Sequence, residues 1–412
     1  MLTRRRFLQL TGGSLAAYGT SPMWLRLGPA WAEGATGGKK LVVILLAGGN
    51  DGLNTVIPYG SPAYHDARKT IAYTEAEVLK LPDSTFVGLN PALAKLHGLY
   101  GAGKVAVIQG VSYDEPDLSH FGSMDVWQSG SPTHEVSTGW LGRYLDASPG
   151  GGSVVRAVAI GNNLPTALIG AEESGVAVPS FGGFTFYDGS DADTASEPYR
   201  LHETFLRCAD APMETIPAKA LLTSQRRTVT AVRAINGLAG PESKPPANLA
   251  EQMGMAMTLL ASNLGVEIVF LTLGSFDDHA ATEQNHPKLL AQVDAAVDRF
   301  ATEVAAKPNP TDYLLMTFSE FGRRVAEDGS AGTDHGTAAP MFVVGDAVAG
   351  GLHGAHPALE KANLDKNGNM IRTVEFREVY ATILDRFLAR APSTEVLRYS
   401  SAAGLHPVPF LK

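Results

Sequence analysis

The stretch KLVVILLAGGNDG, residues 40–52, decides the expected fold. Its residues Leu41 to Leu46 are all aliphatic, and the run stops at glycine before Asn50 and Asp51. A strand that is apolar on both sides is typical of a parallel sheet, because helices cover both faces of such a sheet. The stretch therefore predicts a buried central strand with polar groups at its carboxyl end.

Five similar runs follow, and segments with helical periodicity separate them. The expected strands are 104–111, 155–161, 266–274, 312–320 and 340–346. The expected helices are 90–100, 119–128, 195–208, 215–236, 247–263, 286–306 and 374–389. This alternation of strand and helix indicates a doubly wound α/β sheet.

The composition limits the classes of function. The chain has 412 residues, of which 44% are hydrophobic, and a net charge of −9. Because no dense Lys/Arg block follows the N-terminus, nucleic acid is not expected as the main partner. Beyond the N-terminal segment no apolar run is long enough to span a membrane.

The N-terminus has the pattern of an export signal. Arg4 and Arg5 precede Phe7 in TRRRFLQL, which resembles the twin-arginine motif, and Ala30 and Ala32 suit cleavage after residue 32. We expect recognition by the twin-arginine translocation machinery and a periplasmic or secreted protein. The alternative is an amphipathic start that happens to contain arginines.

The remaining chain, 33–412, is expected to form a single domain with a Gly/Ser/Pro-rich elaboration near 162–245. Its one cysteine, Cys208, excludes an internal disulfide framework and a thiolate metal cluster. Any metal must therefore be held by carboxylate, imidazole or hydroxyl groups. Cys208 itself is interpreted as a small buried apolar residue.

Polar side chains gather in loops beside the expected strands. In an open α/β sheet, ligands bind at the carboxyl ends of the strands. The residues in these loops are Asn50, Asp51, Asn54, Ser119, His120, Asp277, Asp278, His279, His286, Glu320, Arg323, Arg324, Asp334 and His335. Taken singly, each of these residues could have a structural role in place of a functional one, since Asp and Ser often cap helices and a lone His is usually a hydrogen-bonded polar side chain.

Together these groups suit metal-assisted ester chemistry. Two divalent cations about 4 Å apart need several carboxylates and imidazoles that converge from different strands. A serine at a helix start, such as Ser119, is exposed to backbone N–H donors that stabilise an anion. An arginine such as Arg323 can hold two oxygens of a phosphate or sulfate.

Six motifs resemble a known family. They are LLAGGNDGLNTVIPY, LSHFGSMDVWQSG, STGWLGRYL, SFDDHAATEQNH, TFSEFGRR and AGTDHGTAAPMFVVG. They resemble, in order, the exported bacterial family DUF1501, which looks like a branch of the alkaline phosphatase superfamily. The resemblance implies a three-layer α/β/α sandwich with a mostly parallel central sheet, two metal sites, and a Ser or Thr nucleophile.

The resemblance also implies roles for single residues. Asp51, Asp334 and His335 match the ligands of one metal, and Asp277 and His279 match those of the other. His286 would lie near the second ion, and Ser119, beside His120, is the expected nucleophile. The metals would be divalent ions, Zn, Mn, Mg or Ca, and the glycines around Asp334 would allow a tight turn.

The chain departs from the superfamily at three points. The superfamily spaces its Asp and His as D-x-x-x-H, whereas Asp277 and His279 form D-x-H. A later ligand His has two candidates, His353 and His356. The sulfatase context around a modifiable Cys or Ser is missing at Ser119, which favours phosphate over sulfate.

Other family motifs suggest supporting roles. In TGWLGRYL the expected role is to position a helix, although Arg143 could reach an anion. Glu320 is a candidate to orient a ligand histidine, and Arg323 would pair with Glu320 or face the pocket.

Two functions of different classes follow. The first is an exported metal-dependent hydrolase or transferase acting on a small or polymeric phosphate ester, or less readily a sulfate ester. The alternative is a degenerate, metal-stabilised binding or scaffold protein of the cell envelope. Hydrolysis of a non-phosphate ester with one metal is a third possibility.

Overall fold

The aliphatic run from Leu41 to Leu46 forms strand β1 (Lys40–Leu46) in a computed structural model of the chain. Its side chains alternate between two separate cores. Leu41, Val43 and Leu45 pack into one core, and their neighbours Val42 and Ile44 pack into the other. This is the burial pattern of a strand covered on both faces.

The structure describes residues 38–133, 136–148, 150, 153, 155–181, 231, 234–238, 244–399 and 404–412. All of them belong to one compact unit. The expected signal peptide (1–32), Cys208, the helix at 195–208 and nearly all of the helix at 215–236 lie outside the described residues. Most of the elaboration near 162–245 does too.

The elements near the sheet's functional edge are β1, the short η2 (Gly52–Asn54), β5 (Val105–Ser112), α4 (His120–Ser129), β8 (Ile268–Leu273), α9 (Thr282–Ala305), β9 (Tyr313–Phe318) and β10 (Ala339–Val344). The remaining strands of the main sheet are β6 (Ala157–Ile160), β7 (Val176–Val178), β11 (Gly351–His353) and β12 (Val374–Glu375). The other helices are α2 (Pro62–Ala67), α3 (Ala94–Gly101), α5 (Trp140–Ala147), α8 (Leu249–Ala261), α10 (Phe376–Thr382), which continues as a π-helix over Ile383–Leu388, and α11 (Ser393–Val396).

The main sheet is mixed and mostly parallel. Its order is β11-β5-β10-β9-β1-β8-β6-β7, with β12 also paired to β5. Only β10 runs antiparallel to its neighbours, β5 and β9. The start of β10 therefore lies at the same edge as the ends of the parallel strands. This orientation explains why the Asp-His loop, which precedes its strand, reaches the edge where the other polar loops follow theirs.

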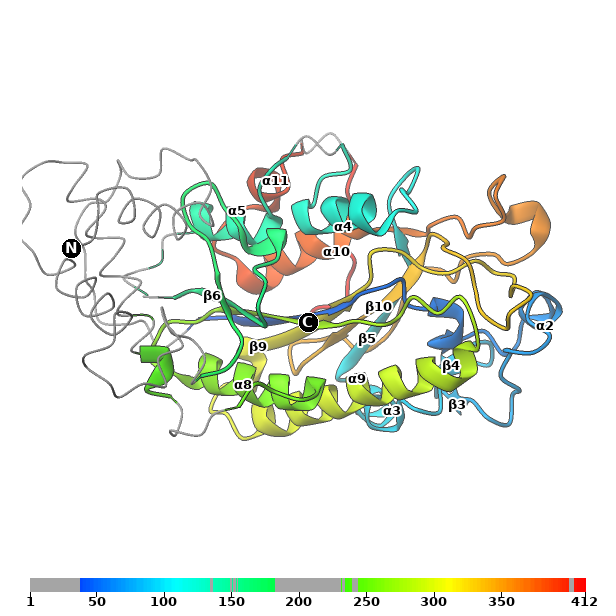
Figure 1. The fold of residues 1–412 in the computed structure, drawn as a ribbon, viewed down its shortest axis with the longest axis horizontal. Helices are drawn as coiled ribbons and strands as arrows, with labels where there is room; N and C mark the ends of the chain where they lie inside the picture. Colours follow the sequence, from blue (N-terminus) through cyan, green and yellow to red (C-terminus); the bar gives the residue numbers. More distant parts are fainter. Residues whose placement is uncertain are drawn as a thin grey trace, which may run out of the picture. The chain divides into compact units, whose positions relative to one another are not determined.

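Helices cover both faces of the sheet. Figure 1 shows α4, α5 and α10 on one side and α3, α8 and α9 on the other. The first group contributes to the core that contains Leu41, and the second to the core that contains Val42. A third, smaller cluster lies around a three-stranded sheet of β2 (Val56–Ile57), β4 (Gly88–Leu89) and β3 (Leu79–Lys80). The predicted three-layer α/β/α sandwich is confirmed.

All six predicted strands are present within a few residues of their expected bounds. The helices predicted at 90–100, 119–128, 247–263, 286–306 and 374–389 correspond to α3, α4, α8, α9 and α10 with its π-helical continuation. The prediction did not include α2, the small three-stranded sheet or strands β7, β11 and β12. These elements have two to six residues each, too few to show a periodic pattern. Among the described residues no helix has the length and apolarity needed to cross a membrane.

Candidate metal centre

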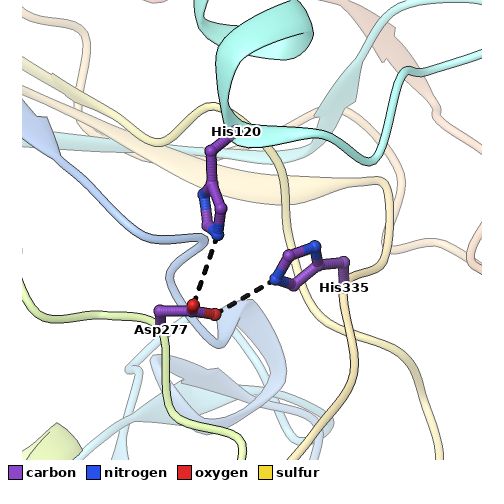
Figure 2. A group of neighbouring side chains, drawn as sticks. All are labelled: His120, Asp277 and His335. Carbon is purple, nitrogen blue, oxygen red and sulfur yellow. Dashed lines mark hydrogen bonds and ion pairs between the residues drawn. The ribbon is translucent and has the colours of Figure 1, made fainter.

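Side chains from three distant segments meet at the carboxyl edge of the sheet. Figure 2 shows His120 of α4, Asp277 from the loop after β8, and His335 from the loop before β10 pointing toward one another. Asp277 Oδ1 lies 3.1 Å from His335 Nε2, and Asp277 Oδ2 lies 3.4 Å from His120 Nε2. The sequence-based prediction that these loops converge is borne out by their geometry.

His279 adds a fourth group to this cluster. Its Nε2 atom lies 3.0 Å from Asp277 Oδ1 and 3.1 Å from His335 Nε2. The D-x-H spacing therefore lets both side chains reach the same point. We refer to His120, Asp277, His279 and His335 as the His3Asp cluster.

Two of the histidines are held in one orientation by their other ring nitrogen. His120 Nδ1 lies 2.8 Å from Glu320 Oε1, and His335 Nδ1 lies 2.8 Å from the backbone oxygen of Leu118. Both partners are acceptors, so each Nδ1 is the protonated nitrogen. In the neutral rings Nε2 then presents a lone pair toward Asp277. Histidines that bind metals are usually fixed in this way, by a carboxylate or a carbonyl on the far nitrogen.

Arg323 orders the loops beneath the cluster. Its guanidinium donates to Asp277 Oδ1 at 2.6 Å and to the backbone oxygens of Gly48, Gly49, Phe276 and Thr333. Partial burial alone would raise the pKa of Asp277, but the hydrogen bond and the charge of the Arg323 guanidinium outweigh it and hold that pKa well below its usual range. Arg323 is 1% exposed and pairs with Asp277, and its other hydrogen bonds connect the loops that carry the cluster.

Glycines let the loops approach closely. A Cβ on Gly48 would lie 2.5 Å from the backbone nitrogen of Asp277. Cβ atoms on Gly332 and Gly336 would collide with the backbone of His279 and of Arg323. Neither of these two glycines around Asp334 has a left-handed φ, and both allow close contact between backbones.

Asp51 does not join the His3Asp cluster. Its carboxylate is 3% exposed, accepts from the backbone nitrogens of Leu53 and Asn54, and forms a 2.6 Å ion pair with Arg68, which is fully buried. Burial would raise the pKa of Asp51, but the charge and hydrogen bond of Arg68 lower it overall. Asp51, expected to bind a metal, thus lies apart from the cluster, and its oxygens cap η2 and pair with a guanidinium.

His286 is also separate from the cluster. Helix α9 begins at Thr282, earlier than predicted, so His286 lies on the helix face that contains Leu289, Leu290 and Val293, all buried. Its Nε2 atom lies 2.9 Å from Asn50 Oδ1. Burial lowers the pKa of His286 to about 4, which keeps the ring neutral.

Asp334 lies at the outer side of the cluster and is half exposed. Its Oδ1 atom is 3.8 Å from His279 Nδ1, and its Oδ2 atom is 3.6 Å from Arg324 Nη1. Asp334, His279 and Asp328 form a second group, in which their ligand atoms lie within 4.8 Å of one another. Asp334 and His335, expected at one ion, lie in these two groups, and His279 belongs to both.

Ser119 occupies the N-cap position of α4 and is exposed, but its hydroxyl does not cap the helix. Its own backbone nitrogen donates to Asp117 Oδ1 at 2.8 Å. Ser119 stands between Leu118, whose oxygen holds His335, and His120. The serine is therefore a neighbour of the cluster in the chain, with a hydroxyl that the helix does not use.

Three further predicted candidates have structural partners elsewhere. His353 Nε2 contacts the backbone oxygen of Ala349, and the His356 ring packs edge-on against Phe86. Arg143 is 5% exposed and donates to the backbone oxygens of Ser129, Thr138 and Val396. None of the three is part of the cluster, and Arg143 has the helix-positioning role expected of its motif.

A cleft of about 560 Å³ opens beside the cluster. His120, Asp277 and Glu320 line it together with residues of α4, the end of β1 and the loop at 274–275. Cleft and cluster thus share side chains and form one continuous surface.

The donor set suits a divalent ion. Ligand atoms on a tetrahedral Zn²⁺, each about 2.05 Å from the ion, lie about 3.3 Å apart. Within the cluster, Asp277 Oδ1, His279 Nε2 and His335 Nε2 lie 3.0, 3.1 and 3.1 Å from one another, which is near that value. Ligand atoms of His120, Asp277 and His335 lie within 4.8 Å of one another. Three imidazoles and one carboxylate are also a common zinc ligand chemistry. The residues present therefore fit a resident metal ion.

Sequence reasoning missed two contributors to this region. Arg68 comes from the residue after α2, and no pattern in the sequence connects it to Asp51. Asp328 was missed because it lies alone in a polar loop. Phe121, which lines the cleft, could have been found from the sequence, because it directly follows the candidate His120.

Several solved structures are similar to this chain. A protein of the alkaline phosphatase superfamily from Vibrio parahaemolyticus is 10% identical, with 98% of this chain and 80% of that chain covered and a TM-score of 0.38. A sulfatase from Pseudoalteromonas sp. is 9% identical, with coverages of 96% and 71% and a TM-score of 0.36. An alkaline phosphatase from the Antarctic bacterium TAB5 is 12% identical, with coverages of 76% and 93% and a TM-score of 0.33. Scores this low carry no argument about chemistry.

A search of curated proteins finds no match. The model of the family described as protein of unknown function DUF1501 matches residues 109–389, which include His120, Asp277, His279 and His335. Because this match covers more than half of the chain, the protein belongs to the DUF1501 family.

Proposed function

We propose that this protein is a metal-dependent hydrolase of an anionic ester, in the first place a phosphate ester. One observation carries the proposal. Side chains from three segments far apart in sequence converge: Asp277, His279 and His335 have ligand atoms 3.0 to 3.1 Å apart, and ligand atoms of His120, Asp277 and His335 lie within 4.8 Å of one another. In the absence of a cation, lone pairs of His120 and His335 would face a carboxylate.

The chain's own residues prepare this site before any ion binds. Glu320 and the oxygen of Leu118 fix the tautomers of His120 and His335. Arg323 fixes the Asp277 carboxylate and keeps it ionised. When bound, a divalent ion supplies Lewis-acid polarisation of an ester oxygen and lowers the pKa of a nearby hydroxyl.

Basic side chains balance two carboxylates of the site. Asp277 is paired with Arg323, and Asp334 faces Arg324. A bound divalent ion would offset the two remaining carboxylates, Glu320 and Asp328, and would offer a Lewis acid to an anionic ester oxygen. Phosphate is preferred to sulfate because Ser119 lacks the sequence context in which sulfatases modify their nucleophile.

Ser119 is the proposed nucleophile. Its hydroxyl is exposed and not engaged in capping α4, and both of its chain neighbours touch the cluster. An attacking serine needs a base or cation close by to lower the pKa of its hydroxyl. His120, the next residue, belongs to the proposed ligand set.

One tightly held ion is proposed in place of the two expected from the family resemblance. The carboxylate predicted for the other ion, Asp51, is fully engaged with Arg68 and the start of η2. We further propose that the reaction takes place outside the cytoplasm, on the basis of Arg4 and Arg5 at the N-terminus.

Metal content of the purified protein tests the ligand set directly. Elemental mass spectrometry should find about one divalent ion per chain. The ion should be lost in Asp277→Asn and His335→Ala, and retained in Asp51→Asn. His406→Ala, which removes an exposed histidine elsewhere, is the matched control. Metal-free wild type after exposure to Zn, Mn, Mg and Ca would refute the proposal.

Turnover is tested separately with a panel of phosphate and sulfate monoesters. Ser119→Ala should lower kcat at least a hundredfold while leaving the metal content unchanged. Metal binding without hydrolysis of any ester, in wild type and in Ser119→Ala alike, would instead support the non-catalytic scaffold.

A further inference from the structure

The loop after β8 contains a serine with an unusual backbone conformation. Ser275 has a φ of 76°, which lies in the left-handed region that favours glycine. The preceding residue is a glycine, yet Gly274 has no positive φ, and a Cβ there would meet no atom within 4 Å. The chain therefore has a side chain at the strained position and a glycine at the unstrained one.

Contacts on both sides hold Ser275 in this conformation. Its backbone oxygen accepts from Asn285 Nδ2 at 3.0 Å, and the backbone nitrogen of Phe276 donates to the oxygen of Ala47 at 3.2 Å. Phe276 is 1% exposed and packs in a hydrophobic core. Asn285 also donates to Asp278 Oδ1 at 2.7 Å, so its amide connects the start of α9 to this loop. The surrounding structure thus fixes the backbone of Ser275.

Ser275 lines the cleft that opens beside the His3Asp cluster. Asp277, two residues later, lines the same cleft and belongs to the cluster. Ser275 is exposed, and its hydroxyl makes no hydrogen bond to another group in the described part of the chain. Six residues other than glycine have a positive φ in that part of the chain, and among them Ser275 alone lines this cleft. Residues held in strained conformations by their surroundings are concentrated at active sites.

We propose that Ser275 is a further catalytic residue, whose hydroxyl donates a hydrogen bond to a non-bridging oxygen of the anionic ester. The inference rests on the proposed function and deepens it, because it assigns a second hydroxyl to the site beside that of Ser119. An O–H donor that is fixed before the substrate binds stabilises negative charge on such an oxygen without further reorganisation. The positive φ has a purpose in this arrangement, since any other φ would turn the Cα–Cβ bond of Ser275 away from its present direction.

Two substitutions separate the hydroxyl from the backbone strain. Ser275→Ala removes the hydroxyl and keeps a Cβ, whereas Ser275→Gly removes both. Each variant should keep the metal content of wild type and lower kcat for a phosphate monoester roughly 10- to 100-fold. Ser275→Gly should melt about 1–2 °C above Ser275→Ala, because glycine adopts the left-handed conformation without strain. Ala389→Gly, at an exposed residue with a positive φ outside the cleft, is the control and should keep the kcat of wild type.

Binding of inorganic phosphate to the metal-loaded protein tests the same contact without turnover. In calorimetric titrations the dissociation constant should rise roughly tenfold in both Ser275 variants and stay unchanged in the control. Phosphate binding that depends on Ser275, in a protein that hydrolyses no ester, would refute the hydrolase and support this contact.

Three results would overturn the inference. The first is wild-type kcat and phosphate affinity in both Ser275 variants, which would leave the proposed hydrolysis in place. The second is a loss of kcat that only accompanies a loss of metal content or a lower melting temperature, since the role of Ser275 would then be structural. The third is metal-loaded wild type that binds no phosphate.

Discussion

Substitution of Arg68 with methionine would remove the buried cation beside Asp51 and keep a side chain of similar length. Arg68 is 0% exposed and makes four hydrogen bonds, to Asp51 Oδ2 at 2.6 Å, Asn54 Oδ1 at 2.9 Å, and the backbone oxygens of Val325 and Arg324. The variant would leave Asp51 ionised in a dry environment with only two backbone N–H groups as partners.

The expected cost is large. Breaking a buried ion pair by removing one partner destabilises a protein by about 3–5 kcal/mol. A typical domain has a free energy of unfolding of about 5–15 kcal/mol, so the variant should lose a substantial part of its stability. The double variant Arg68→Met/Asp51→Asn should recover part of the loss, because no uncompensated charge remains.

Urea unfolding of wild type, both single variants and the double variant measures these values and their coupling. The series should be repeated with added Zn²⁺ and Mn²⁺. A loss below about 1 kcal/mol in Arg68→Met would refute the argument that this pair is buried and essential. Rescue of Arg68→Met by metal, but not of the double variant, would show that Asp51 accepts an ion when the guanidinium is absent.

Three further outcomes are expected. Burial lowers the pKa of His286 from 6.5 to about 4, so between pH 6.5 and 4 the unfolded chain binds a proton more readily than the folded protein does. The free energy of unfolding should therefore fall by about 3 kcal/mol as the pH drops from 6.5 to 4. His286→Gln should flatten that dependence in urea titrations, and an unchanged slope would contradict it. Gly48→Ala should reduce metal content and cost about 1–3 kcal/mol, since its Cβ would lie 2.5 Å from the Asp277 nitrogen; normal metal content in the folded variant would argue against this packing. Arg143→Met should lower the free energy of unfolding by about 1–3 kcal/mol, and with it the melting temperature, because three hydrogen bonds to backbone oxygens are lost. Ester hydrolysis per folded molecule should be unchanged. Loss of activity without loss of stability would give Arg143 a role at the site.

The sheet and its functional edge could be predicted from the sequence because the strands are continuous aliphatic runs. In Leu41 to Leu46 every side chain is buried, which identifies a covered strand without knowledge of its neighbours. The rule that ligands gather at the ends of parallel strands then located His120, Asp277, His279 and His335 in the same region.

The grouping of these residues could not be predicted from the residues alone. Asp51 and Asp277 both follow strands of the sheet, yet Arg68 occupies the first carboxylate and Arg323 the second. No pattern in the sequence shows that Arg68 pairs with Asp51 and Arg323 with Asp277. His286 was misplaced for a simpler reason. Helix α9 starts four residues earlier than its apolar periodicity suggests, because Pro287 interrupts the pattern near the first turn.

The topology of β1 and β5 has a consequence for the order of events during synthesis. Among the strands that the structure describes, β1 pairs with β8 and β9 alone, and β5 pairs with β10, β11 and β12, all from the C-terminal part of the chain. A chain still growing on the ribosome therefore holds its first two long strands without partners until β8 to β12 have emerged, and pairings of such long range form slowly. The last of the four potential ligands, His335, emerges just before β10. The proposed ion site would thus be completed only when nearly all of the sheet can close, so uptake of a metal would report that folding has finished.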